Sequence, residues 1–122
     1  MQIVLAHSDK EYVEQLKIFF FKNGFTDIHI FYDGFEVLRH IIKNRNQLVI
    51  VEEELPGLNA ADIKTALVFK RIRSKFLILG SKDEIGQKAG IVQSISYSMS
   101  KDLSAKKIFS KLKTELKLHD VG

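Results

Sequence analysis

The stretch LVIVEEELPG, residues 48–57, guides the interpretation of the whole chain. Its first half, Leu48–Val51, is a short continuous apolar run, as expected for a strand buried on both faces of a parallel sheet. Three glutamates follow at once, and Pro56-Gly57 then turns the chain. Open α/β sheets place their sites at the carboxyl ends of strands, so Glu52 is a candidate site residue. The alternative is that the three glutamates only keep a loop solvated.

Apolar segments on both sides of this stretch predict a chain in which strands and helices alternate. Further strands are expected at Gln2–Ala6, Ile28–Phe31, Phe76–Leu79 and within Ile91–Met99. Apolar residues at helical spacing predict helices over Tyr12–Phe20, Phe35–Ile42, Ile63–Phe69, Asp83–Ala89 and Leu103–Leu118, with Asp9 and Asn59 as caps of the first and third. Five strands and five helices joined by short loops imply one α/β domain over residues 1–122, with helices on both faces of a parallel sheet.

Composition excludes several classes of function. There is no cysteine, which rules out disulfides, zinc–thiolate sites and thiol nucleophiles. The longest apolar run falls far short of the ~20 residues that span a bilayer, and no signal-peptide pattern is present, so we expect a cytoplasmic protein without membrane insertion. The net charge of +4 permits weak attraction to nucleic acid, but the chain carries no DNA-binding motif. We therefore expect no nucleic-acid partner and interpret the basic residues mainly as solvated surface.

Several blocks of sequence together resemble the receiver domain of bacterial two-component response regulators. They are IVL at 3–5, KNGF at 22–25, DGFEVL at 33–38, LVIVEEELPG at 48–57 and the strand-lysine-helix unit around Lys101. The resemblance covers essentially the whole chain. It implies a CheY-like, flavodoxin-like fold with five parallel strands in the order 2-1-3-4-5, flanked by five helices. It also implies a role in signal transduction, in which an aspartate after strand three accepts a phosphoryl group and an acidic pair after strand one holds magnesium.

The positions of the phosphoryl chemistry are altered in this chain. By resemblance, the acceptor corresponds to Glu52, the acidic pair to His7 and Ser8, and the switch hydroxyl to Gly80. The pocket that corresponds to the family's site consists of His7, Ser8, Asp9, Gly80, Ser81 and Lys101. Of these, Asp9 lies one place after the acidic pair, Ser81 is adjacent to the switch position, and Lys101 matches the family's lysine.

Magnesium prefers hard oxygen ligands that usually include one or two carboxylates. His7 and Ser8 supply no carboxylate, so we expect weak or absent magnesium binding and no cofactor. The Glu52 carboxylate is also one C–C bond, about 1.5 Å, farther out than that of an aspartate. We therefore interpret the chain as a phosphorylation-independent pseudo-receiver and not as an enzyme. The alternative is a functional phospho-acceptor that uses Glu52, Asp9 and a non-standard cation site.

Glu52 and the histidines allow further interpretations. An ion pair between Glu52 and Lys101 would fix one conformation of the loop after strand five, whereas the alternative is that both are solvated remnants. His7 beside Glu52 could bind a transition metal, or it could be a structural loop histidine. The remaining histidines, His29, His40 and His119, show no ligand spacing with one another.

The resemblance also implies a surface for protein partners. Family members bind partners and dimerise through the face formed by helix four, strand five and helix five. Here that face would carry Tyr97 or Ser98 together with Lys106 and Lys107. Aromatic and cationic side chains suit protein interfaces, so we expect a protein partner or a homodimer at this face. The alternative is an ordinary edge strand beside a solvated helix.

Overall fold

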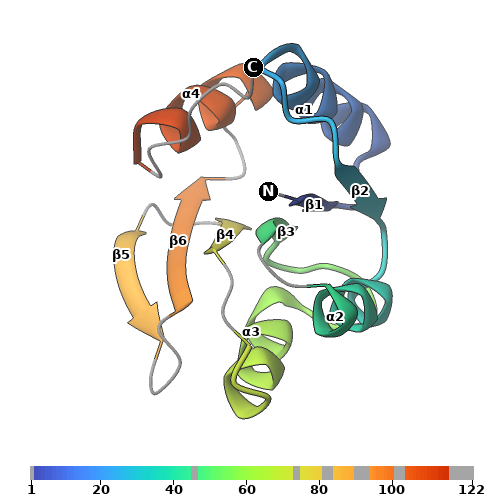
Figure 1. Ribbon diagram of the computed structural model, residues 1–122, viewed down its shortest axis with the longest axis vertical. Coiled ribbons are helices and arrows are strands. Elements are labelled where there is room, and N and C mark those ends of the chain that lie inside the picture. The colour runs from blue at the N-terminus through green and yellow to red at the C-terminus, as the bar shows by residue number, and fades with distance from the viewer. Residues whose placement is uncertain are drawn as a thin grey trace.

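The computed structural model describes residues 2–44, 47–72, 75–80, 84–89, 94–100 and 104–115. Within these residues, strands and helices follow one another as shown in Figure 1. Their bounds are β1 Gln2–Ala6, α1 Lys10–Lys22, β2 Ile28–Phe31, α2 Gly34–Lys43, β3 Gln47–Glu52, α3 Ala60–Phe69, β4 Lys75–Gly80, β5 Glu84–Ala89, β6 Ser94–Ser100 and α4 Ala105–Glu115.

The strands form one sheet in the order β2-β1-β3-β4-β6-β5. The strands β2, β1, β3, β4 and β6 pair in parallel, and β5 pairs with β6 in the antiparallel sense at the edge. The predicted α/β class and the parallel arrangement of the five expected strands are therefore confirmed, in the order 2-1-3-4-5 when β6 is counted as the fifth. The predicted counts of five strands and five helices are wrong, because the described residues form six strands, one of them antiparallel, and four helices. The buried apolar runs of β1 and β3 explain their central places, since a strand covered on both faces needs no polar face.

The prediction of a helix over Asp83–Ala89 is wrong, because residues Glu84–Ala89 form strand β5. Gly86 lies inside this segment and would cost an α-helix about 1 kcal/mol relative to alanine. In the sheet, the pairing with β6 shifts register between Glu84 and Gln87, the two residues that bracket Gly86. Glycine inside a strand often accompanies such an irregularity. Hydrogen bonding to β6 therefore decides the conformation of a segment whose own helical pattern is weak.

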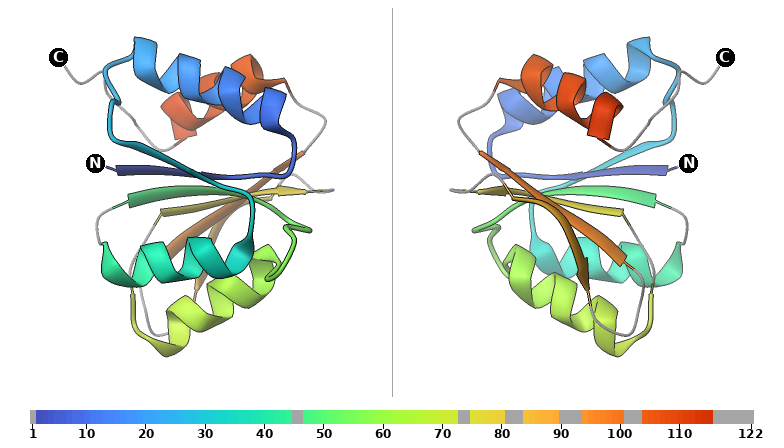
Figure 2. Two further views of the ribbon diagram at one scale, coloured as in Figure 1. Left: turned by 90° about the vertical axis from the view of Figure 1, so that its right-hand side faces the viewer. Right: turned by 90° about the vertical axis from the view of Figure 1, so that its left-hand side faces the viewer.

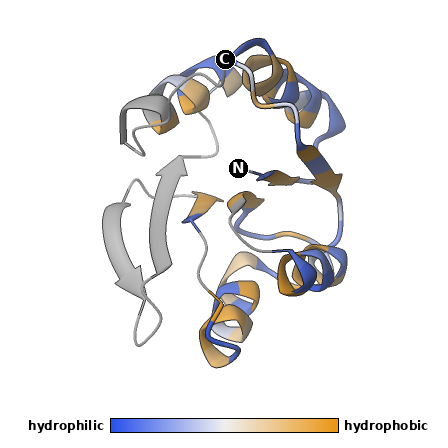
Figure 3. Cartoon of the chain, viewed as in Figure 1, coloured by the Kyte–Doolittle hydropathy of each residue, from blue (hydrophilic) through white to orange (hydrophobic). Residues whose placement is uncertain are grey.

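Two hydrophobic cores lie on opposite faces of the sheet. Helices α1 and α4 cover one face, and α2 and α3 cover the other (Figure 2). On the first face, the ring of Phe20 meets Phe25 and Phe109 edge to face, with centroids 5.8 and 4.9 Å away. Hydropathy colouring shows the hydrophobic strands between helices of mixed character (Figure 3). No helix in the described ranges is long and apolar enough to span a bilayer.

Side-chain caps fix where three of the helices begin. Asp9 accepts from the backbone N–H groups of Glu11 and Tyr12, so the predicted cap of α1 is confirmed. Asn59 accepts from Asp62 N–H at the start of α3, as predicted, and Asp33 caps α2 in the same way. These contacts satisfy N–H groups that the first turn of a helix leaves without a partner. Each helix therefore begins directly after the loop at the carboxyl end of the preceding strand.

Two of these loops touch because glycine stands at the contact. The Gly34 N–H donates to the carbonyl of Pro56 at 2.8 Å, and a Cβ at Gly34 would collide with the Leu58 carbonyl. Gly57 adopts a positive φ of 85°, which most other residues rarely adopt. The turn after β3 therefore packs against the start of α2.

Candidate functional site

The carboxyl ends of β1 and β3 place the predicted site residues side by side. Ala6, the last residue of β1, is in register with Val51 of β3. The next residues along the chain, His7 and Ser8, therefore leave the sheet beside Glu52. Neighbouring parallel strands deliver their carboxyl ends to one edge of the sheet, where sites of α/β proteins commonly form. Sequence reasoning placed these residues in one pocket, and the structure brings them together.

The carboxylate of Glu52 accepts hydrogen bonds from Ser8. Its Oε1 accepts from the Ser8 backbone N–H at 3.2 Å and from Ser8 Oγ at 2.8 Å, and Oγ also lies 3.1 Å from Oε2. The Glu52 side chain is 20% exposed, so these contacts form at the rim of the core. Hydrogen bonds to an ionised carboxylate are among the stronger ones in proteins. The loop after β1 is therefore tied to the end of β3 by the residue that resemblance assigns to the acidic pair.

His7 is the second residue of this loop that lies beside the Glu52 carboxylate. Its Nε2 lies 3.6 Å from Glu52 Oε2, and its Nδ1 accepts from the Asp9 backbone N–H at 2.9 Å. A neutral imidazole whose Nδ1 accepts carries its proton on Nε2, the nitrogen nearer to the carboxylate. The ring also stacks on Tyr12 with centroids 5.0 Å apart. Burial raises the pKa of Tyr12 to about 12, so this phenol remains neutral throughout the physiological range.

The side chain of Asp9 has a different role from the one considered for it. Its Oδ1 accepts from two backbone N–H groups in the first turn of α1. These bonds make Asp9 a helix cap, with a negative charge at the positive end of the helix dipole. Asp9 therefore caps α1, whereas the two residues before it, His7 and Ser8, contact Glu52.

Glu53 is a neighbour of the site that sequence reasoning missed. A Cβ built at Gly80 would collide with the Glu53 carboxylate, so this side chain lies directly over the Gly80 backbone. The Glu53 N–H donates to Leu79 O at 2.9 Å, and its carbonyl accepts from Ala60 N–H at 3.1 Å. Gly80 is the position that resemblance assigns to a switch hydroxyl. In this chain, the Glu53 carboxylate fills the space that a side chain at position 80 would take, and it comes from the turn that follows β3.

Two of the predicted site residues fall outside the part of the chain that the structure describes, and two residues of the predicted interaction face lie in β6. Ser81 and Lys101 are outside the described residues, so the expected ion pair between Glu52 and Lys101 stays a prediction. In β6, Tyr97 is in register with Leu77 of β4, and Ser98 with Ile78. Ser98 also pairs with Glu84 of β5, so β6 is an interior strand and the alternative of an ordinary edge strand is wrong. The correction follows from the extra strand β5, which sequence analysis had assigned to a helix.

The predicted lysines of the interaction face are placed on the last helix. Lys106 and Lys107 are both exposed in the first turn of α4, where the Lys107 N–H donates to Ser104 Oγ at 3.3 Å. Their exposure is consistent with a binding surface and equally with a solvated helix. The proposed partner face therefore stays a prediction.

The donors around Glu52 do not fit a magnesium site. Magnesium needs oxygen ligands in near-octahedral geometry, with carboxylates among them. Here a backbone N–H, a hydroxyl that donates and an imidazole N–H point toward one carboxylate, and Asp9 is used as a cap. Among the residues that the structure describes, no group of three or more acidic, histidine or cysteine side chains could hold a metal ion. The described side chains at this edge can therefore hold a carboxylate in place, and their donors do not match the oxygen ligands that magnesium prefers.

The fold of this chain also occurs in other proteins of known structure. No protein-family model and no curated protein sequence matches the chain. Solved structures do match over nearly its whole length, and they include receiver and response regulatory domains. The chain has the receiver fold. One similar structure is the signal receiver domain of an HD domain-containing protein from Pseudomonas fluorescens Pf-5, with 14% identity, a TM-score of 0.62 and coverage of 95% of this chain and 94% of that one.

Two more receiver folds are equally similar. The response regulatory domain of protein mrkE from Klebsiella pneumoniae has 12% identity and a TM-score of 0.63, and each chain is covered to 96%. A two component transcriptional regulator AraC from Clostridium phytofermentans ISDg has 13% identity and a TM-score of 0.64, with 96% of this chain and 92% of that one covered. The structural likeness establishes the receiver fold. Because the sequence identities are low, the activity of this chain has to be inferred from its own residues.

A second polar cluster brings together two histidines that showed no ligand spacing in the sequence. The rings of His29 on β2 and His40 on α2 lie 4.6 Å apart. His29 Nε2 lies 2.7 Å from Asp27 Oδ1, and His40 Nε2 lies 2.6 Å from Gln2 Oε1. Burial lowers the pKa of His40, and the neighbouring His29 lowers it further, while Asp27 opposes the shift. The folded protein therefore favours neutral His40.

This shift predicts how stability depends on pH. Below its ordinary pKa of 6.5 the unfolded chain protonates His40 more readily than the folded one, so folding loses stability as pH falls from 7.5 to 5.5. His40→Gln removes this titration and is expected to lose less stability over the same interval. Urea unfolding at both pH values measures the difference. An equal loss in the parent and in His40→Gln would contradict the assignment.

Proposed function

We propose that this chain is a receiver-like signalling module that acts by binding other proteins and does not depend on phosphorylation. One observation carries the proposal. The carboxylate at the acceptor position, Glu52, accepts hydrogen bonds from the backbone and hydroxyl of Ser8. Ser8 occupies a position that the family resemblance gives to a magnesium ligand. The contact therefore joins the same two loops that a bound cation would join in a phosphorylated receiver, and it forms without a phosphoryl group.

The electrostatics of this edge support the same proposal. A phosphoryl donor carries several negative charges and would approach Glu52 with Glu53 and Glu54 next to it in the chain. The Glu53 carboxylate lies over Gly80, on the strand beside Glu52. The described residues that contact Glu52 include no lysine or arginine to offset these charges, so the approach of the donor is disfavoured. For Glu52 to attack a phosphorus atom it would also have to give up its bonds to Ser8, and each bond to a charged group is worth about 1.5–3 kcal/mol.

In this proposal the module has no catalytic activity and needs no resident cofactor. Its output is a contact with a protein partner, and self-association into a homodimer through the surface that includes Lys106 and Lys107 is one form of it. The proposal places the protein in the cytoplasm of a bacterium. The similar structures support a signalling role, since they are named as a signal receiver domain, a response regulatory domain and a two component transcriptional regulator.

Intact-mass spectrometry tests the proposal directly. After incubation with acetyl phosphate and magnesium, we expect no added phosphate mass on this chain, because Ser8 holds Glu52 and the described residues around it offer magnesium a poor ligand set. A receiver domain that has the acceptor aspartate and acidic pair serves as the positive control in the same reaction. A phosphate adduct that maps to Glu52 and disappears in Glu52→Gln would overturn the proposal. That result would establish the alternative, a working phospho-acceptor with a non-standard cation site.

A further inference from the structure

The outer face of α3 is unusually apolar for a helix at the surface. Its inner face is buried through Ile63 and Leu67, yet Val68 and Phe69 follow on the other side. Phe69 is 84% exposed, the highest value among the large exposed apolar side chains of the described residues. A helix whose apolar residues surround it is normally covered on both sides. This chain supplies a cover for the inner face of α3, and the described residues supply none for Phe69.

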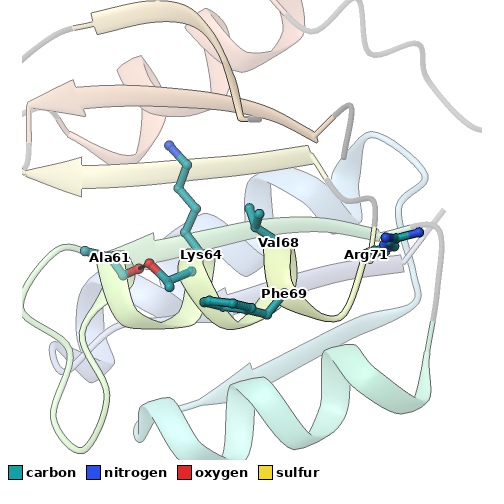
Figure 4. A pocket seen from close by; sticks show the side chains of 6 residues that line it. Ala61, Lys64, Val68, Phe69 and Arg71 are labelled. Carbon is teal, nitrogen blue, oxygen red and sulfur yellow. Dashed lines mark hydrogen bonds between the residues drawn. The ribbon is translucent and has the colours of Figure 1, made fainter. Parts of the chain in front are cut away.

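A pocket of about 540 Å³ lies along this face. The side chains that line it come from successive turns of α3 and from Arg71, two residues beyond the end of the helix (Figure 4). They are Ala61, Lys64, Thr65, Val68, Phe69 and Arg71. Residues 61, 64, 65 and 68 follow the spacing of one helix face. We call this surface the α3 groove. Helix α3 has 10 residues and is therefore about 15 Å long, which matches about three turns of a second helix laid beside it.

The α3 groove is flanked by positive charge. Lys64 lines it, and Lys70 and Arg71 lie at the end of the helix. No carboxylate of the described residues lies within ion-pair distance of these three cations. Arg71 also adopts a positive φ of 55°, a conformation that a residue with a side chain adopts at some energetic cost. The groove thus combines an apolar centre with cations at its rim, the pattern expected where an acidic and apolar segment binds.

We propose that the α3 groove binds an acidic amphipathic helix of another protein. The apolar side chains of that helix would pack on Val68 and Phe69, and its carboxylates would meet Lys64 and Arg71. A second copy of this chain is a poorer occupant, because a two-fold contact would bring together two surfaces that each carry Lys64, Lys70 and Arg71, and like charges repel. This inference uses the proposed function only in taking a protein as the partner. It does not depend on the chemistry of Glu52, so either proposal can fail alone.

Synthetic peptides test the chemistry of the occupant. The probe is a helical peptide of about three to four turns with leucine and phenylalanine at i, i+3, i+4 and i+7 and glutamate elsewhere. Two comparison peptides replace the glutamates by lysine or the apolar residues by serine. We expect the acidic amphipathic peptide to shift NMR amide signals of residues 61–71 and to bind at least about tenfold more tightly than either comparison peptide. Equal binding of the lysine peptide would overturn the proposal.

Paired variants test the place of binding. Phe69→Ser and Lys64→Glu are each expected to weaken binding of the acidic peptide by about tenfold or more, and the Lys64→Glu effect should shrink at high salt. Phe21→Ser and Lys17→Glu, at exposed positions of α1, are the matched controls and should leave affinity unchanged. Circular dichroism checks that all four variants fold.

Three outcomes would contradict the assignment of the groove. The first is an equal loss of affinity in the α1 controls, which would mean that binding is not located on α3. The second is a concentration-dependent dimer that Phe69→Ser abolishes in sedimentation velocity, which would assign the groove to a second copy. The third is displacement of the peptide by anionic lipid vesicles or an oligonucleotide, which would assign the cations to a different class of partner.

Discussion

The double variant His7→Asp/Ser8→Asp is expected to be less stable than the parent protein without magnesium and to recover stability when magnesium is added. The substitutions remove the Ser8 hydroxyl that donates to Glu52 and the His7 N–H beside it. They also place two new carboxylates next to Glu52, where like charges repel. We expect the free energy of unfolding to fall by about 2–4 kcal/mol in the presence of a chelator.

Magnesium should reverse this loss because three carboxylates at the edge of the sheet would satisfy its preference for hard oxygen ligands. Ligand binding to the folded state alone raises stability in proportion to the logarithm of ligand concentration. Thermal unfolding with a chelator and at increasing magnesium concentrations measures both effects. The parent protein should show neither, because its site lacks the ligands.

The matched control for this experiment is Lys17→Glu, which changes net charge by the same two units at an exposed position of α1. It should not gain a response to magnesium. If the parent and the double variant responded equally to magnesium, then His7 and Ser8 would not be the reason for weak magnesium binding. If the double variant were as stable as the parent in chelator, the bonds from Ser8 to Glu52 would contribute little to folding.

Phe20→Ala is expected to lower the free energy of unfolding by about 3–5 kcal/mol, as is typical when a fully buried phenylalanine is truncated. Phe20 is completely buried, and its ring contacts Phe25 and Phe109 edge to face. It therefore joins α1 to α4 over the sheet. A small domain has only about 5–15 kcal/mol of stability, so the loss is a large fraction of the total.

The neighbouring Phe21 is a sharp control because it has the same side chain in the same helix but is 59% exposed. Phe21→Ala should change stability by no more than about 0.5 kcal/mol. Urea unfolding of the two variants, with the m-value unchanged, measures the contrast. Losses of similar size in the two variants would contradict the packing of α1 described above.

Sequence reasoning located the edge of the sheet where the site lies but not the contacts within it. The buried run before Glu52 and the apolar segment before His7 indicated two parallel strands, and the carboxyl ends of such strands meet. Nothing in the spacing showed that Ser8 donates to Glu52 or that Glu53 covers Gly80. Those contacts depend on side-chain directions, which follow from the register of β1 against β3.

The sequence alone determined the α/β class, the strands with continuous apolar runs and the caps that begin α1 and α3. These features are local, since they depend on residues within a few positions of one another. Tertiary structure decided the conformation of Glu84–Ala89, the meeting of His29 with His40, and the use of Ser8 as a donor to Glu52. Each of these depends on a partner distant in the chain, and the free energy of pairing with that partner outweighs weak local preference.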